Sequence, residues 1–185
     1  MLEQPENPVI PQRENAQVRA ISREVDIAWL AGIIDGEGSI TCDLQMIETG
    51  RSYLDCKVRV YNTDVRMIQK IARIYSEMNV VFFYNLNKKV KEHYKNQMGI
   101  CVTSQGSCRK VLEAVLPYLA NKQDVAKLMI EVIRFVQAIP KDFNKASDYY
   151  KDPTMLELIE RWKAAKVFHI DPSTTKRKAR EVISW

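Results

Sequence analysis

One short stretch of the chain changes from helical spacing to strand-like spacing, and this change restricts the folds that the chain can adopt. Apolar residues recur at helical spacing over one stretch: Ile27, Leu30, Ala31 and Ile34. The segment 35–38, Asp-Gly-Glu-Gly, follows, and glycine often ends a helix. Apolar and polar residues then alternate, as in a strand with one buried face. The sequence predicts a buried helix that ends in two acids directly before a strand.

Two alternating runs follow this helix and predict an antiparallel hairpin around a short polar turn. Their inward-facing residues are apolar: Ile40, Cys42, Leu44, Met46, Leu54, Cys56, Val58 and Val60. The order of a helix and two strands then recurs, with a helix at 65–75, strands at 80–86 and 97–103, and helical spacing again from residue 111. The sequence therefore predicts an α+β fold of order αββαββα, with one four-stranded antiparallel sheet backed by helices on one face.

The chain is expected to have three parts. Residues 1–22 lack a long apolar period and are expected to form a flexible N-terminal arm. Residues 23–140 contain the repeated helix and strand pattern and form the predicted core. Residues 141–185 form a predicted helical extension, with a helix after Pro153, and a basic tail that carries Lys176, Arg177, Lys178 and Arg180.

Composition excludes several classes of protein. A hydrophobic fraction of 46% predicts a packed core, and a net charge of +5 favours a polyanionic partner. With two histidines and four cysteines that form no CxxC pair, a histidine triad or a zinc site is not expected, so any metal must be held by oxygen. The chain lacks a membrane span or a secretory signal, which predicts an intracellular, reducing location in the cytoplasm or an organelle.

The second face of the predicted sheet carries both charges, amides and hydroxyls, which can pair with base edges and phosphates. By strand parity, the candidate DNA-binding residues on this face are Thr41, Asp43, Gln45, Tyr53, Asp55, Lys57, Arg59, Tyr61, Gln97 and Thr103. Lys88 and Lys89 lie in a basic turn between the later strands and are candidate phosphate contacts. An ordinary solvated sheet face is the alternative interpretation of the same residues.

Residues 30–38 read Leu-Ala-Gly-Ile-Ile-Asp-Gly-Glu-Gly, and this segment resembles the motif that names the LAGLIDADG homing endonuclease family. Ser39 and Ile40 also fit the usual continuation of the motif into a strand. Ala28, Gly32 and Gly36 form a stripe of small residues at four-residue spacing, which lets two helix backbones approach closely. A buried helix with a glycine cap, whose acids face water, is the alternative.

The resemblance implies a homodimer. In this family a chain with two motifs folds as a pseudo-dimer and a chain with one motif dimerises, and this sequence contains one copy. The expected interface residues are Ala28, Leu30, Ala31, Gly32 and Asp35. A two-fold axis through this interface then predicts a pseudo-palindromic DNA target.

The resemblance also implies the metal site. Glu37, one from each subunit, would be the catalytic and metal-binding acid, with the Gly36 carbonyl as a second ligand. The family name has Asp where this sequence has Glu. Oxygen ligands suit Mg²⁺, or Mn²⁺ in its place, whereas Ca²⁺ is expected to bind without supporting cleavage. Asp35 is expected to support the helix end or the partner helix.

Three further residues resemble the family's peripheral site, which arranges solvent around the metal ions. Asn62 ends the second strand, Arg66 lies one helical turn later, and Lys122 follows a turn of sequence Pro-Tyr-Leu. Lysine here could orient the attacking water or stabilise developing charge. A structural explanation is open for each residue: a helix cap for Asn62, and plain surface cations for Arg66 and Lys122.

Taken together, the resemblance implies a homing endonuclease that makes a staggered double-strand break in a long pseudo-palindromic DNA target. Cleavage would be metal-dependent phosphodiester hydrolysis and would promote intron mobility. An intron maturase that binds structured RNA, or a nucleic-acid-binding protein that does not cleave, is the alternative. A plain basic interaction module is a second alternative. The presence of Glu37 favours cleavage over both.

Overall fold

The structure of the chain, a computed structural model, describes residues 12–46, 52–87, 96–139 and 152–166. Its elements in chain order are α1 (Gln12–Glu37), β1 (Gly38–Met46), β2 (Ser52–Asn62), α2 (Val65–Glu77), β3 (Phe83–Asn87), β4 (Gln97–Val102), α3 (Gln105–Val115), the short 3-10 helix η1 (Leu116–Tyr118), α4 (Gln123–Ala138) and α5 (Pro153–Lys166).

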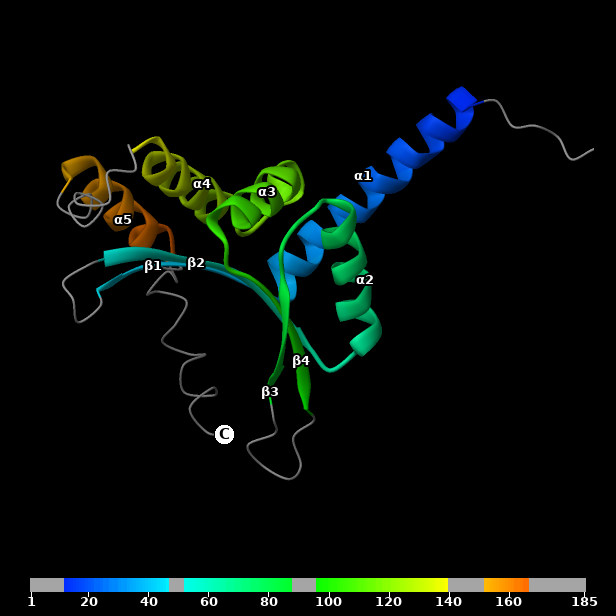
Figure 1. Cartoon of the computed structure of the whole chain (residues 1–185), viewed down its shortest axis with the longest axis horizontal. Coiled ribbons are helices and arrows are strands. Elements are labelled where there is room, and N and C mark those ends of the chain that lie inside the picture. The colour runs from blue at the N-terminus through cyan, green and yellow to red at the C-terminus, as the bar shows by residue number, and fades with distance from the viewer. Residues whose placement is uncertain (1–11, 47–51, 88–95, 140–151, 167–185) are drawn as a thin grey trace, which may run out of the picture.

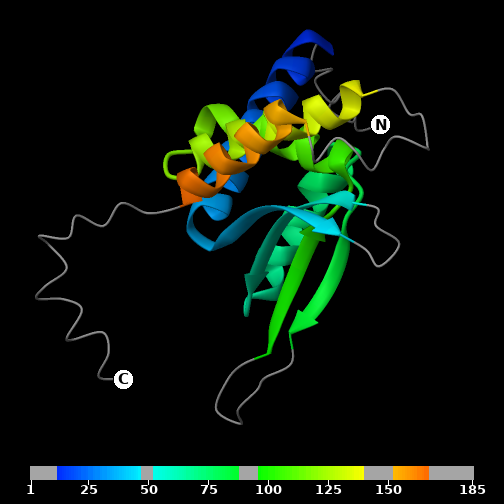
Figure 2. The same cartoon turned by 90° about the vertical axis from the view of Figure 1, so that its left-hand side faces the viewer.

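The four strands form one antiparallel sheet in the order β1-β2-β4-β3. Cys42 lies opposite Cys56, and Val60 lies opposite both Gly38 and Ile100, so the two hairpins join through β2 and β4. The helices lie on one side of this curved sheet, and the other side carries no described helix (Figures 1 and 2). The predicted α+β class and the four-stranded antiparallel sheet are confirmed.

A single buried cluster joins the sheet to the helices. The inward-facing residues of β1 and β2 are at most 8% exposed wherever their side chains are described, which confirms the predicted alternation: Ile40, Cys42, Leu54, Cys56, Val58 and Val60. They pack with fully buried residues of the helices, including Leu30 and Ile34 of α1, Ile68 of α2, Leu112 of α3 and Ile133 of α4. Alternation with period two places these apolar side chains on one face, and that face needs the helices to cover it.

Cys42, Cys56 and Cys108 are part of this core, Cys101 is buried on the other face of the sheet, and none of the four is paired in a disulfide. Burial raises the pKa of the Cys108 thiol to about 12. Hydrogen bonding with Cys42, together with burial, raises the pKa of the Cys56 thiol above its usual range. The Cys56 and Cys108 thiols therefore stay protonated at neutral pH and contribute to the core as small apolar side chains.

The first helix is longer than the sequence analysis expected. α1 begins at Gln12, so the prediction of a flexible arm through residue 22 is wrong for residues 12–22, and residues 1–11 lie outside the described part. The added turns contain no Gly or Pro and consist largely of good helix formers, which lets the helix extend ahead of its packed part. Asp26 then lies within the helix and pairs with Lys70 and Arg73 of α2 at 3.3 and 3.0 Å.

One strand boundary differs from the predicted one, and the predicted C-terminal helix is present. β3 begins at Phe83 instead of residue 80, because the chain turns at Asn79, which has a φ of 53°. Asparagine tolerates this left-handed conformation better than most residues. The helix expected after Pro153 is present as α5, and its buried Met155, Leu158 and Trp162 belong to the core cluster. None of the helices in the described ranges is long and apolar enough to cross a membrane.

Candidate active site at the end of the first helix

The junction of α1 and β1 depends on a glycine. Glu37 is the last residue of α1 and is exposed, and Gly38 is the first residue of β1. A Cβ atom on Gly38 would lie 2.7 Å from both the Cα and the carbonyl oxygen of Ile34. Only glycine therefore lets the strand leave the helix at this angle. This close approach fixes the direction in which the chain carries Glu37 out of the helix.

Asp35 ties this helix end to the start of α4. Its carboxylate accepts hydrogen bonds from the backbone N–H groups of Ala120, Asn121 and Lys122, at 2.6, 3.2 and 2.9 Å. Burial alone would raise the pKa of Asp35, but the three N–H donors and the Lys122 charge hold that pKa below its usual value. Asp35 is therefore an ionised carboxylate that positions the 120–122 segment.

Lys122 adds a second set of bonds between the 120–122 segment and α1, with the side chain now on the segment and the backbone groups on the helix. Its Nζ donates to the carbonyl oxygen of Ile34 at 2.8 Å and to that of Asp35. These carbonyls belong to the last turn of α1, where helix carbonyls lack helical partners. Burial lowers the pKa of Lys122, and the charges of Asp35 and Glu37 partly oppose that shift. The structure thus brings Lys122 against the last turn of α1, beside Asp35, although 87 positions separate the two residues in the sequence.

This group of residues is called the α1–α4 corner: Asp35, Gly36, Glu37, Ala120, Asn121 and Lys122. A cavity of about 200 Å³ lies beside it, lined by Gly38, Ser39 and Ile40, by Asn121, Lys122 and Val125, and by Ala165. Ala165 belongs to α5, so the C-terminal extension reaches the corner. Nothing in the local sequence around Ala165 could have indicated this, because the contact depends on how α5 packs on α4.

The corner offers oxygen donors for a metal ion. The Glu37 carboxylate and the Gly36 carbonyl are the donors that the resemblance implied, and oxygen donors suit Mg²⁺. Across the described ranges, no group of three or more His, Cys, Asp or Glu side chains lies close enough to hold a metal. One chain therefore offers only part of a coordination shell, and the other ligands would be water, phosphate oxygens or groups of a second copy.

Asn62 and Arg66 have structural contacts at the start of α2. The Asn62 side chain accepts from the backbone N–H of Asp64 at 2.8 Å. Asp64 caps α2, accepting from the Arg66 backbone N–H at 2.9 Å, and its carboxylate pairs with the exposed Arg66 guanidinium at 2.8 Å. The cap of α2 is thus Asp64, and Asn62 supports it from the preceding turn, while a role for Asn62 or Arg66 around metal ions stays a prediction.

The face of the sheet that lacks a helix is called the outer sheet face. Register and burial place on it Ser39, Thr41, Asp43, Asp55, Lys57, Arg59, Tyr61, Phe83, Asn85, Gly99 and Cys101. Gln97 is exposed on the same face, and Thr103 is exposed just beyond β4. The backbones of Gln45 and Tyr53 lie in β1 and β2, but their side chains are outside the described part, as are Lys88 and Lys89 entirely.

Charges on this face lie close to one another. Asp43 is directly opposite Asp55, and two carboxylates in this position repel. Lys57 compensates, because its Nζ lies 2.5 Å from a carboxylate oxygen of Asp55. The Nε atom of Arg59 is buried and has no hydrogen-bond partner. These groups therefore present acceptors and donors that neighbouring side chains satisfy only in part.

Tyr61 spans three strands of the outer sheet face. Tyr61, Gly99 and Asn85 lie in one row across β2, β4 and β3. A Cβ atom on Gly99 would overlap the Tyr61 ring, so the ring lies directly on the glycine. The Asn85 amide donates to the Tyr61 hydroxyl at 3.1 Å. Sequence parity found Tyr61 but missed Gly99 and Asn85, because the pairing of β4 with β2 was not known.

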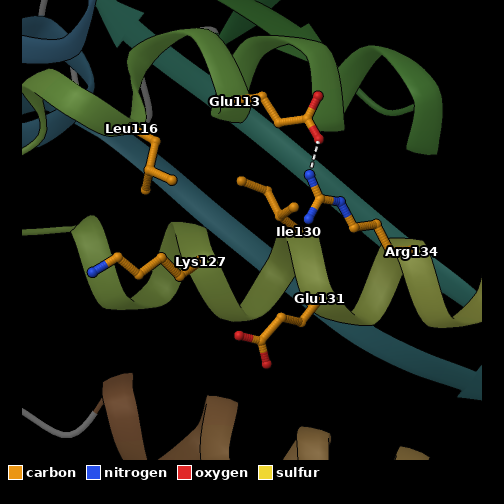
Figure 3. Close-up of a pocket in the computed structure, with 6 residues that line it drawn as sticks. All are labelled: Glu113, Leu116, Lys127, Ile130, Glu131 and Arg134. Carbon is orange, nitrogen blue, oxygen red and sulfur yellow. Dashed lines mark hydrogen bonds and ion pairs between the residues drawn. The ribbon is translucent and has the colours of Figure 1, made fainter.

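Another pocket lies away from the corner, between α3 and α4 (Figure 3). It has a volume of about 460 Å³ and is lined by Glu113, Leu116, Lys127, Ile130, Glu131 and Arg134. Glu113 and Arg134 pair across it at 2.7 Å. None of the predicted site residues lines this pocket, and its facing charges already neutralise each other.

The expected dimer interface needs a correction. Leu30 and Ala31 are fully buried in the core of their own chain, so the prediction that they contact a second copy is wrong. Asp35 bonds within its own chain to the 120–122 segment. Gly32 is exposed and Ala28 is half-buried, and a Cβ atom on Gly32 would meet nothing within 4 Å. Helical spacing placed these residues on one helix but did not indicate which face its own sheet would cover.

The chain is similar to a homing endonuclease from Chlorella vulgaris. It is 28% identical over 111 residues to the DNA endonuclease I-CvuI. The alignment covers 60% of this chain and 65% of I-CvuI, slightly less than two thirds of that relative's length. No family model matches the chain.

Solved structures share the fold. I-CvuI in complex with DNA superposes with a TM-score of 0.57 at 22% identity, covering 78% of this chain and 82% of I-CvuI. I-SmaMI, a LAGLIDADG homing endonuclease bound to cleaved DNA, superposes with a TM-score of 0.54 at 16% identity, covering 76% of this chain and 43% of I-SmaMI. The motif at the α1–β1 junction, the shared fold and the Chlorella relative thus make the chain similar to LAGLIDADG homing endonucleases.

Proposed function

We propose that the protein is a site-specific DNA endonuclease that makes a staggered double-strand break by metal-dependent hydrolysis. The α1–α4 corner is the observation that carries this proposal. There the exposed Glu37 ends α1 directly before β1, and the Lys122 ammonium bonds to carbonyl oxygens of the same helix turn. A polar sheet face of this kind can lie along DNA, and the corner then meets the phosphate backbone.

The working unit would be a homodimer on a pseudo-palindromic target. The chain aligns with 82% of I-CvuI but with only 43% of I-SmaMI, as expected for a chain with one motif. A homodimer places one Glu37 from each copy near the two-fold axis, which provides one acid for each DNA strand. Exposed Gly32 and Gly36 permit close approach of two copies of α1.

Each residue of the corner has a distinct part. Glu37 and the Gly36 carbonyl would hold Mg²⁺, or Mn²⁺, which when bound lowers the pKa of water and neutralises charge on the phosphate. Lys122 supplies a fixed positive charge beside the scissile phosphate and can orient the attacking water. Asp35 is a positioning residue, because it holds the 120–122 segment that carries Lys122.

Recognition would fall to the outer sheet face. Arg59, Lys57 and Tyr61 offer donors, while Asp43 and Asp55 offer acceptors, which suits contacts to base edges as well as to phosphates. The biological role that follows is intron mobility, in a reducing intracellular compartment where the four thiols stay free. Structured RNA remains the second partner class under the maturase alternative.

The direct test is cleavage of a plasmid library of randomised, near-palindromic sites in Mg²⁺ buffer, with sequencing of the linear products. The protein is expected to cut a narrow set of sites. Glu37→Gln should keep DNA binding and lower the cleavage rate by at least about a thousandfold. Glu77→Gln, which removes an exposed acid of α2, serves as the matched control and should cut normally.

Three results would count against the proposal. Equal cleavage by Glu37→Gln would remove this acid from the mechanism. Specific DNA binding without cleavage in Mg²⁺ or Mn²⁺ would favour the non-cleaving alternative. Tighter binding to structured RNA than to any DNA site would favour the maturase alternative.

A further inference from the structure

α1 has two apolar faces. One faces its own chain and carries the buried Ile27, Leu30 and Ile34. On the opposite side lie three large aliphatic side chains with little cover: Val18, Ile21 and Val25, which are 65, 55 and 60% exposed. A helix that packs only on its own domain would carry polar residues on this second side.

The second face has the spacing of a coiled-coil seam. Its members follow at intervals of three and four residues: Val18, Ile21, Val25, Ala28 and Gly32. This is the alternation of a and d positions in a heptad repeat, with β-branched valines at two successive a positions. The seam therefore begins in the exposed N-terminal turns and runs without interruption into the small residues of the family motif.

α1 is oriented about its own axis so that the seam faces away from the other helices and the sheet. Glu24 accepts a hydrogen bond from the Tyr118 hydroxyl of η1 at 3.0 Å, and Asp26 pairs with Lys70 and Arg73 of α2. These contacts join two other sides of α1 to η1 and α2. The N-terminal turns of α1 project beyond the remaining described helices and the sheet (Figures 1 and 2), so no other described element covers the seam.

We propose that the α1 helices of two copies pair as a parallel coiled coil from Val18 to Gly32, well beyond the motif. This inference rests on the proposed homodimer. Two Glu37 carboxylates that act on one DNA site must lie at the same end of the pair, so the helices run in the same direction. In that arrangement Glu24 of one copy faces the Trp29 position of the other, and no like charges oppose each other along the seam.

The coiled coil also constrains how steeply the helices cross. Val18 lies 14 residues before Gly32, or roughly 21 Å along the helix. A crossing of about 50° centred on Gly32 would leave the two Val18 residues roughly 20 Å or more apart, whereas a crossing near 20° keeps the seam in contact. The exposed valines and isoleucine are buried only in the second geometry.

Disulfide trapping tests this geometry in the full-length protein. Ile21→Cys places a thiol on the seam, and Arg19→Cys places one at an exposed position of α1 that points away from the seam. A disulfide needs Cα atoms within roughly 7 Å, which facing seam positions satisfy. The native cysteines are buried and do not compete. Mild oxidation should give a covalent dimer with Ile21→Cys, seen on a non-reducing gel, and little or none with Arg19→Cys.

Sedimentation of the unoxidised protein separates the two ways in which the idea can fail. A dimer in solution without cross-linking at position 21 would overturn the coiled coil and leave the homodimer intact. A monomer at micromolar concentration would overturn both. Equal cross-linking at positions 19 and 21 would indicate unspecific collision and would also overturn the proposed seam.

A charge substitution gives an independent measurement. Val25→Lys would place an ammonium inside the seam and should raise the dimer dissociation constant at least about tenfold. Val81→Lys is the matched control, because Val81 is 71% exposed and lies outside α1. Unchanged dimer affinity in Val25→Lys, with circular dichroism confirming an intact fold, would contradict the proposal.

Discussion

The α1–α4 corner and the outer sheet face hold their polar side chains in different ways. At the corner, Asp35 and Lys122 bond to backbone N–H and C=O groups of the opposite segment. On the outer sheet face, Lys57 bonds to Asp55, and Asn85 bonds to Tyr61, side chain to side chain. Backbone groups in packed elements move little, whereas side-chain partners can exchange for DNA groups. The difference suggests that the fold fixes the place of the chemistry and leaves recognition adjustable.

Replacing Mg²⁺ by Ca²⁺ should separate the two regions most strongly. Ca²⁺ is larger and accepts looser oxygen geometry, so we expect it to occupy the site without positioning water and phosphate for reaction. Cleavage should fall at least about a thousandfold, while DNA binding through the outer sheet face persists. Gel-shift and cleavage assays on the same target measure both. Loss of binding together with cleavage would show that the two regions do not act separately.

Lys122→Met should have the next largest effect. Methionine keeps an unbranched side chain but removes the charge and both bonds to the α1 carbonyls. We expect the single-turnover cleavage rate to drop about a hundredfold with DNA binding nearly unchanged. Lys127→Met, on the exposed side of α4, is the control. If Lys122→Met cleaves normally, the α1–α4 corner has only a structural role and the Lys122 ammonium has no part in the reaction.

Asp35→Ala should act mainly on stability. Three backbone N–H groups lose a charged acceptor, and the free energy of unfolding should fall by about 2 kcal/mol in urea titrations. Asp124→Ala, an exposed acid of α4, should change it by less than about 0.5 kcal/mol. A loss for Asp35→Ala no larger than that of the control would mean that these bonds do not hold the corner.

The lowered pKa of Asp35 adds a pH signature to this substitution. A carboxylate whose folded pKa lies below its unfolded value of about 3.9 stabilises the protein above that value, and the contribution disappears as pH falls through the folded pKa. The difference in stability between the wild type and Asp35→Ala should therefore shrink as the pH falls below about 4. A difference that is constant down to pH 2 would contradict the ionised Asp35.

Gly99→Ala should have the smallest effect and would probe the adjustable region. The added methyl group displaces the Tyr61 ring and breaks its bond with Asn85. Because the partners are side chains over an open face, stability should change by roughly 1 kcal/mol or less, while target affinity falls a few-fold. Calorimetry and gel-shift titration give the two numbers. A larger loss of stability than in Asp35→Ala would reverse the comparison between the two regions.

Much of the site could be predicted from the sequence because its signals are local. The glycine and acid pattern at 35–38 lies in one stretch, and the alternation of β1 and β2 gave the correct inward and outward residues wherever side chains are described. The resemblance added Lys122, which the structure places against the last turn of α1, and its part in the reaction stays a prediction. The Tyr61–Gly99–Asn85 row could not be found, because it depends on the pairing of strands from different hairpins.

The sequence by itself determined the order of helices and strands, the position of Glu37 at a helix end and the alternation that builds the outer sheet face. The tertiary structure decided that Leu30 and Ala31 are core residues, that Asp35 and Lys122 bond to each other's segments, and that α5 reaches the cavity beside them. The physical reason is that periodicity shows which residues share a face of one element. Which face is covered depends on the elements that pack against it, and these come from distant parts of the chain.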